Sequence, residues 1–190
     1  MGVFQSGFPG PYRTYSAGGL AGQLNRTIFA QTAVATVGNT AVETTLMSTS
    51  GAVGSKTIPA SYLKAGNYIK VYLSGSIETD AIPPLLTLTL YYGAEVLSTV
   101  AVTPGAIIAA GTYFEYTATI NARSVGATGD VVSGQVMRID NATTPTIVAV
   151  PAVQVTDTTA AGAIDVKITW GTADAQNTIS VLTGYIEVIG

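Results

Sequence analysis

The sequence predicts an all-β fold, an antiparallel β-sandwich of the jelly-roll type that follows an extended N-terminal arm. Two observations lead to this prediction. From about residue 27 onward, apolar and polar residues alternate with a period of two, as in strands with one buried and one solvent-facing side. No window of useful length has the 3.6-residue period of a helix, and no repeat points to a β-propeller or β-helix.

Three segments show the alternation most clearly, and each separates an apolar face from a more polar one. In 67–74, Ile69, Val71 and Leu73 share one face, and Tyr68, Lys70, Tyr72 and Ser74 share the other. In 113–122 the apolar face consists of Phe114, Tyr116, Ala118, Ile120 and Ala122, and in 164–170 of Ile164, Val166, Ile168 and Trp170. We expect these side chains to build the inner walls of the sandwich.

The other strands follow from shorter runs of β-branched and aromatic residues. They are expected at about 28–37, 42–48, 85–92, 95–102, 130–139, 146–155 and 178–189. Turn-forming residues separate them, namely Gly38-Asn39, Pro83-Pro84, Gly93, Pro104-Gly105, Gly126–Gly129 and Ala173-Asp174. At 190 residues, the chain suits one sandwich domain over 27–190 with an arm over 1–26.

The segment 1–26 differs in composition from the rest. Phe4, Phe8, Tyr12 and Tyr15 are spaced by Gly and Pro, and neither a helical nor a strand period emerges. A disordered tail is one interpretation, because chain termini are often disordered. Disordered tails are normally poor in aromatic residues, however. We therefore predict an arm that anchors the chain to a partner through Phe4, Phe8, Pro9, Tyr12, Arg13 and Tyr15.

Charge is scarce along the whole chain. Charged residues make up 10% of the sequence and the net charge is −3, whereas about a quarter of the residues are charged in an average soluble domain. The resulting surface of hydroxyl, amide and small apolar groups can be covered by another protein at low desolvation cost. The eight basic residues form no run, so we expect no nucleic-acid partner. No apolar run approaches the roughly twenty residues that span a bilayer, and we expect no membrane partner.

Reactive side chains are equally scarce. The chain has no His and no Cys, which removes the usual general base, imidazole and thiolate metal ligands and the serine-hydrolase triad. Glu78 and Asp80 form the one close acidic pair and suit a glycosidase, but they sit at an expected strand end, where solvated acids are ordinary. A calcium site would need Asp130, Asp140, Asp157 and Asp174 to converge in space. We predict no catalytic residue, no metal and no cofactor.

Two further features have structural as well as functional interpretations. The glycine-rich stretches Gly18–Gly22 and Gly51–Lys56 lack the spacing of a phosphate-binding loop and are predicted to be flexible connectors. Tyrosine is enriched, and Tyr68 and Tyr72 share the outer face of one strand, while Tyr91, Tyr92, Tyr113 and Tyr185 belong to others. Such tyrosines stack on carbohydrate, contact a second subunit or cap the core. We assign Tyr68, Tyr72, Tyr91 and Tyr113 to a subunit-contact surface.

Several stretches also carry a family resemblance. In order, they are TIPASYLKAGNYIKVYLSGSIET, LTLTLYYGAEVLST, YFEYTATINARSVGATGDVVSGQV and DTTAAGAIDVKITWGTADAQNTISVLTGYIEV, with the Ile58-Pro59-Ala60 turn, the Arg123–Gly126 loop and Asp165–Trp170 as distinguishing elements. Over about Thr27–Val188 the chain resembles a β-sandwich module of tailed-bacteriophage structural proteins, found in capsid decoration or cement proteins, head fibres and tail fibres. The resemblance implies a virion protein, commonly trimeric, and leaves the arm uncovered.

Together these features predict a non-enzymatic decoration or cement protein. It would be made in the host cytoplasm, form a homotrimer and bind the major capsid protein on the head surface, bridging the seams between capsid subunits. The alternative is a fibre or receptor-binding module that contacts host surface glycans.

Overall fold

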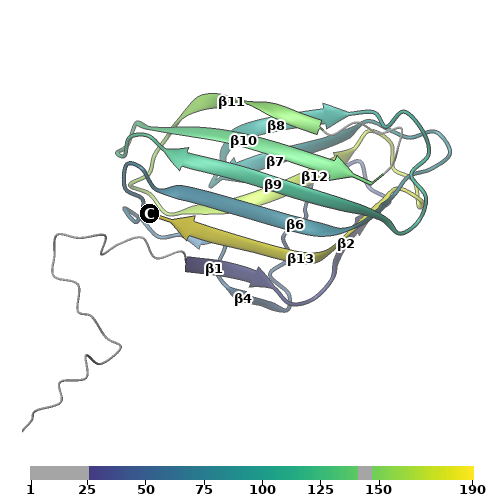
Figure 1. The fold of residues 1–190 in the computed structure, drawn as a ribbon, viewed down its shortest axis with the longest axis horizontal. Coiled ribbons are helices and arrows are strands. Elements are labelled where there is room, and N and C mark those ends of the chain that lie inside the picture. The colour runs from purple at the N-terminus through teal and green to yellow at the C-terminus, as the bar shows by residue number, and fades with distance from the viewer. Residues whose placement is uncertain (1–25, 141–146) are drawn as a thin grey trace, which may run out of the picture.

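The structure, a computed structural model, describes residues 26–140 and 147–190. Every regular element within these ranges is a β-strand (Figure 1). The described residues include no helix that is long and apolar enough to cross a membrane. Except for Arg26, the predicted arm lies outside the described residues, and so do its candidate anchors Phe4, Phe8, Pro9, Tyr12, Arg13 and Tyr15.

The larger of two antiparallel sheets has eight strands. Their spatial order is β11, β10, β9, β6, β13, β1 and β4, and β2 pairs with the first residues of β13 (Figure 1). The bounds are β1 Arg26–Gln31, β2 Ala35–Gly38, β4 Ala52–Gly54, β6 Tyr68–Glu78, β9 Thr112–Ala122, β10 Gly129–Ile139, β11 Ile147–Thr156 and β13 Thr178–Ile189. Strand β11 therefore forms one edge of this sheet, and β4 with β1 forms the other.

The smaller sheet has five strands. Its order is β3, β12, β7 and β8, and β5 also pairs with β12. The bounds are β3 Thr44–Thr45, β5 Thr57–Ile58, β7 Leu86–Tyr92, β8 Glu95–Val102 and β12 Gly162–Trp170. The chain passes between the sheets at every step from β2 to β7, and again from β8 to β9, from β11 to β12 and from β12 to β13. This arrangement confirms the predicted antiparallel β-sandwich.

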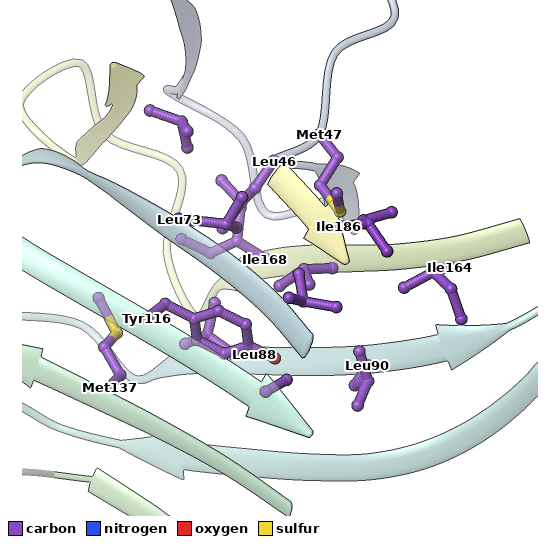
Figure 2. Close-up of a cluster of buried hydrophobic side chains, with 14 of the residues drawn as sticks. Leu46, Met47, Leu73, Leu88, Leu90, Tyr116, Met137, Ile164, Ile168 and Ile186 are labelled. Atoms are coloured by element: carbon purple, nitrogen blue, oxygen red, sulfur yellow. The ribbon is translucent and has the colours of Figure 1, made fainter. Parts of the chain in front are cut away.

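The core fills the space between the two sheets (Figure 2). The predicted inner faces are buried: Ile69, Val71 and Leu73 of β6 are at most 1% exposed, and Trp170 at the end of β12 is fully buried. Buried residues alternate with half-buried or exposed ones along β6 and β12, and along β9 from Tyr113 onward. Burial of these large apolar side chains is the main force that holds the sheets together.

One buried polar network connects the two sheets. The Tyr116 hydroxyl on β9 donates a hydrogen bond of 2.9 Å to Oε1 of Gln135 on β10. The Gln135 amide nitrogen in turn donates to Ser98 Oγ on β8 at 3.1 Å and to the Leu88 carbonyl on β7 at 3.5 Å. Because Tyr116 and Gln135 are at most 1% exposed, these polar groups depend on one another for hydrogen bonding.

The segment 26–58 differs most from the sequence-based prediction. The strand expected at 28–37 is divided into β1 and β2, and only Thr44–Thr45 of the strand expected at 42–48 pairs, as β3. The predicted flexible connector at 51–56 contains the paired strand β4. Gly54 allows this pairing, because it has a φ of +84° and a Cβ at this position would lie 2.1 Å from the Ile28 carbonyl oxygen.

Candidate interaction surface

A row of tyrosines crosses the outer face of the large sheet. Tyr72 on β6 lies directly opposite Tyr185 on β13. Their rings are stacked, with centroids 5.1 Å apart and planes 21° from parallel. The Tyr72 hydroxyl lies 3.4 Å from the hydroxyl of Tyr113 on β9, and Lys70 Nζ lies 5.9 Å from the Tyr185 ring centroid. Three neighbouring strands thus bring Tyr113, Tyr72 and Tyr185 into one continuous group, which we call the tyrosine row.

The tyrosine row is positioned by the strand pairing and is partly exposed. Tyr113 is 45% exposed, while Tyr72 and Tyr185 are half-buried. The hydrogen bond with Tyr72 and partial desolvation raise the pKa of Tyr113, so its hydroxyl stays protonated at neutral pH. Cross-strand aromatic pairs of this kind stabilise a sheet by roughly 0.2–1 kcal/mol. The row therefore presents hydroxyl groups and ring edges to whatever covers this face.

The charges around the tyrosine row stand in pairs of opposite sign. Lys70 on β6 is directly opposite Glu187 on β13. Glu115 on β9 is directly opposite Arg138 on β10. Ser74 and Ser76 of β6 and Thr117 and Thr119 of β9 occupy further outward positions. The centre of this face is therefore close to electrically neutral.

Tyr91, predicted to share a surface with Tyr68, Tyr72 and Tyr113, lies on the other sheet. Its strand, β7, belongs to the smaller sheet, where its hydroxyl donates to both Glu43 carboxylate oxygens at 2.8 and 2.9 Å. Lys167 Nζ lies 4.2 Å from the Tyr91 ring centroid and 3.4 Å from Glu43 Oε2. Desolvation and the hydrogen bond to Glu43 raise the pKa of the Tyr91 hydroxyl.

A second ion pair on the smaller sheet lies beside that group. Lys56 Nζ is 3.0 Å from Asp165 Oδ1, and the two side chains are 14% and 17% exposed. Thr45 Oγ1 also donates to Asp165 Oδ1, and Lys56 Nζ donates to the Met47 carbonyl at 3.0 Å. These contacts hold the segment from Glu43 to Lys56 against β12. We assign Lys56, Asp165 and Thr45 a structural role. The sequence did not indicate it, because Lys56 and Asp165 are far apart along the chain.

Two hollows that share Arg26 and Tyr62 open where the chain enters β1. The larger has a volume of about 490 Å³, and the smaller about 350 Å³. The larger is also lined by Lys64, Ala65, Asn67, Val188 and Gly190, and the smaller by Thr27, Ile28, Gly54, Ser55, Thr57, Ile58 and Pro59. Their lining combines apolar and basic side chains and includes no aspartate or glutamate.

The acidic candidates remain dispersed. Glu78 is the last residue of β6, and Asp80 lies just beyond it, where its carboxylate accepts a hydrogen bond from the Ala81 amide. Asp157 accepts from the hydroxyl and amide of Thr159, and these bonds lower the pKa of Asp157. Within 26–140 and 147–190, no three His, Cys, Asp or Glu side chains are grouped so that they could hold a metal ion.

Comparisons with known proteins gave few matches. No known family and no curated protein matches the sequence. Among solved structures, the chain is similar to arcelin-5, a lectin-like defence protein from Phaseolus vulgaris, with a TM-score of 0.41 and 10% identity over 86% of this chain and 98% of that one. It is also similar to the CBM2 module of the evolved Dit of Lactobacillus casei BL23 phage J-1, with a TM-score of 0.32 and 13% identity over 72% of this chain and 67% of that one.

Proposed function

We propose that the chain is a non-enzymatic structural protein of a tailed-phage virion, which decorates the head and stabilises it across the seams between capsid subunits. In this proposal it acts as a homotrimer, and the major capsid protein is its partner. The β-sandwich supplies a rigid body, and residues 1–26 supply the anchor through their aromatic side chains. The proposal also draws on the resemblance of the sequence to phage β-sandwich modules.

The outer face of the large sheet is the observation that supports this proposal most. The face is broad, and the charged residues near its centre, Lys70, Glu187, Glu115 and Arg138, lie in pairs of opposite sign. Hydroxyl groups and tyrosine rings occupy much of the rest. A protein partner can cover such a face without burying an uncompensated net charge, which is the costly part of forming an interface. This surface suits a protein that functions by fitting against its neighbours.

Binding of this kind stabilises a capsid by mass action. A protein that binds the assembled shell, and not its separated subunits, shifts the assembly equilibrium toward the shell. An arm that orders on docking loses chain entropy but gains contact area over several subunits. The phenylalanine and tyrosine side chains of residues 1–26 suit this role, since aromatic side chains bury the largest areas per residue.

Deletion of residues 2–19 tests the anchor. The full chain and the deletion variant would be mixed with expanded heads made from the major capsid protein of the same genome, and sedimented. We expect the full chain to co-sediment and the deletion variant to stay in the supernatant, with an unchanged circular dichroism spectrum. A length-matched variant with Phe4, Phe8, Tyr12 and Tyr15 all changed to Ser should behave like the deletion. Full occupancy of the heads by both variants would refute the anchor.

A glycan-binding fibre module is the second candidate function, and the exposed Tyr113 favours it. Stacking of a sugar needs an aromatic ring face that is open to solvent. The faces of Tyr72 and Tyr185 are turned toward each other, however, and Lys70 lies near the second ring. The tyrosine row therefore offers less open ring face than its tyrosine content suggests. Binding of the chain to a glycan array, lost in Tyr113→Ala, would favour this second function over the first.

A further inference from the structure

An exposed group of valines lies on the outer face of the large sheet beside the tyrosine row. Val132 and Val136 on β10 are directly opposite Val153 and Val148 on β11. Val136, Val148 and Val153 are 38%, 58% and 51% exposed, and Val132 is half-buried. Residues directly opposite in an antiparallel pair point to the same face, so the four side chains form one surface. We call it the valine patch.

The patch lacks the charges that usually protect such a surface. Strand β11 contains no Lys, Arg, Asp or Glu, and β10 contains none between Asp130 and Arg138. Exposed edge strands normally carry charges, and lysine above all, that prevent association with other chains. Apolar groups gathered on an exposed surface typically mark an interaction site. The composition of β10 and β11 therefore indicates a surface that a partner covers.

The mode of contact follows from the shape of β11. Addition of a further strand to this edge would require a continuous row of backbone donors and acceptors. Pro151 has no amide hydrogen, and the register between β10 and β11 shifts between Ser133 and Gln135. In addition, β8 of the smaller sheet lies beside β11. A partner is therefore expected to pack on the outer face and not to extend the sheet.

The size and charge of the face indicate which partner fits. With strands about 4.8 Å apart and a rise of about 3.3 Å per residue, five strands over nine residues cover roughly 24 by 30 Å, or about 700 Å². A stable protein interface buries about 800 Å² on each partner. The charges of Lys70 and Glu187 and of Glu115 and Arg138 offset one another, so the centres of two such faces meet without net repulsion.

We propose that copies of this chain associate by packing the valine patch of one copy against the outer face of the large sheet of a second copy. The tyrosine row lies on the same face, begins on β9, the strand next to β10, and falls within the area covered. The inference deepens the proposed function, because it assigns the contact between copies to this face and leaves the arm free for the capsid.

Sedimentation velocity of the full chain, without capsids, tests the proposal. The test variant is Val136→Lys/Val148→Lys, which puts two charges into the patch. The matched control is Val42→Lys, because Val42 is 72% exposed and lies in the loop between β2 and β3, outside the strands that carry the patch. We expect the wild type and the control to sediment as an oligomer, and the dissociation constant of the double variant to rise at least about tenfold.

Two results would overturn the proposal. One is a wild-type chain that remains monomeric at about 100 μM, and the other is a double lysine variant with the wild-type dissociation constant. If the lysine variant loses its circular dichroism spectrum, Val148→Thr/Val153→Thr replaces it, because threonine keeps the shape of valine and favours strands. The inference and the proposed function can fail separately. A variant can lose self-association and still bind heads, and a chain can self-associate and still fail to bind heads.

Discussion

Replacing Tyr116 by Phe tests the buried network that joins the sheets. The substitution removes one hydroxyl from a fully buried side chain and keeps the ring that packs in the core (Figure 2). Gln135 Oε1 then loses a donor at 2.9 Å. A buried polar atom left without its partner costs about 1–3 kcal/mol. In a chain of this size each kcal/mol lowers the melting temperature by roughly 2–4 °C.

The same variant has a pH signature. Burial raises the pKa of Tyr116 well above its ordinary value. The unfolded chain releases this proton near pH 10, whereas the folded chain retains it. The contribution of Tyr116 to the free energy of unfolding is therefore fully present below about pH 10, and it is lost as the pH rises toward the folded-state pKa. Above pH 10 this group lowers the free energy of unfolding by about 1.4 kcal/mol per pH unit, a slope that Tyr116→Phe removes.

Urea unfolding followed by circular dichroism measures both effects. Tyr62→Phe is the matched control, because Tyr62 is 38% exposed and its change is expected to stay within about 0.5 kcal/mol. We expect Tyr116→Phe to lose about 1–3 kcal/mol at pH 7 and to have a shallower decline than the wild type above pH 10. Equal losses in the two variants, or parallel declines above pH 10, would refute the structural role of the network.

Three further predictions concern the ion pair, a glycine and a turn. Lys56→Met should lower the free energy of unfolding by about 1–3 kcal/mol, because Asp165 loses its cation in a largely buried position. A double-mutant cycle with Asp165→Asn should show coupling between the two residues, and independent effects of the two substitutions would contradict this. Gly75→Ala should cost at least about 3 kcal/mol, since a Cβ there would lie 1.9 Å from the Ser180 carbonyl oxygen, and wild-type stability in denaturant would disprove it. The pKa of Asp157, measured by NMR titration, should lie below the usual aspartate value of about 3.9, because the hydroxyl and amide of Thr159 donate to the charged carboxylate. A titration midpoint above that value would contradict this.

Much of the fold could be predicted from the sequence, because its strands alternate regularly. Ile69, Val71 and Leu73 face the core, and Tyr68 and Tyr72 face outward, as the period of two predicts. The prediction was weakest in 26–58. There the strands are short, and their pairing depends on contacts with residues far along the chain, which local patterns do not encode.

The candidate site could be predicted only in part. Tyr72 and Tyr113, which the sequence assigned to one surface, lie side by side on the large sheet, and Tyr185 completes the row. Their role as a subunit contact stays a prediction. Tyr91 lies on the smaller sheet, apart from the other three. Alternation in the sequence assigns a face within a strand but does not show to which sheet the strand belongs. The sequence did not indicate the valine patch. The apolar residues of β10 and β11 resemble those of core strands, and only the structure shows that no second sheet covers them. The predicted anchors in residues 1–26 remain a prediction.

Electron microscopy of phage heads assembled with and without this chain tests the central claim most directly. We expect additional density on the outer surface of heads that carry the chain, centred over seams between capsid subunits, with β-sandwich bodies in contact with one another. The same particles should resist heat better than undecorated heads. Density confined to the tail or to a fibre, with head surfaces unchanged, would show that the chain is not a head decoration protein.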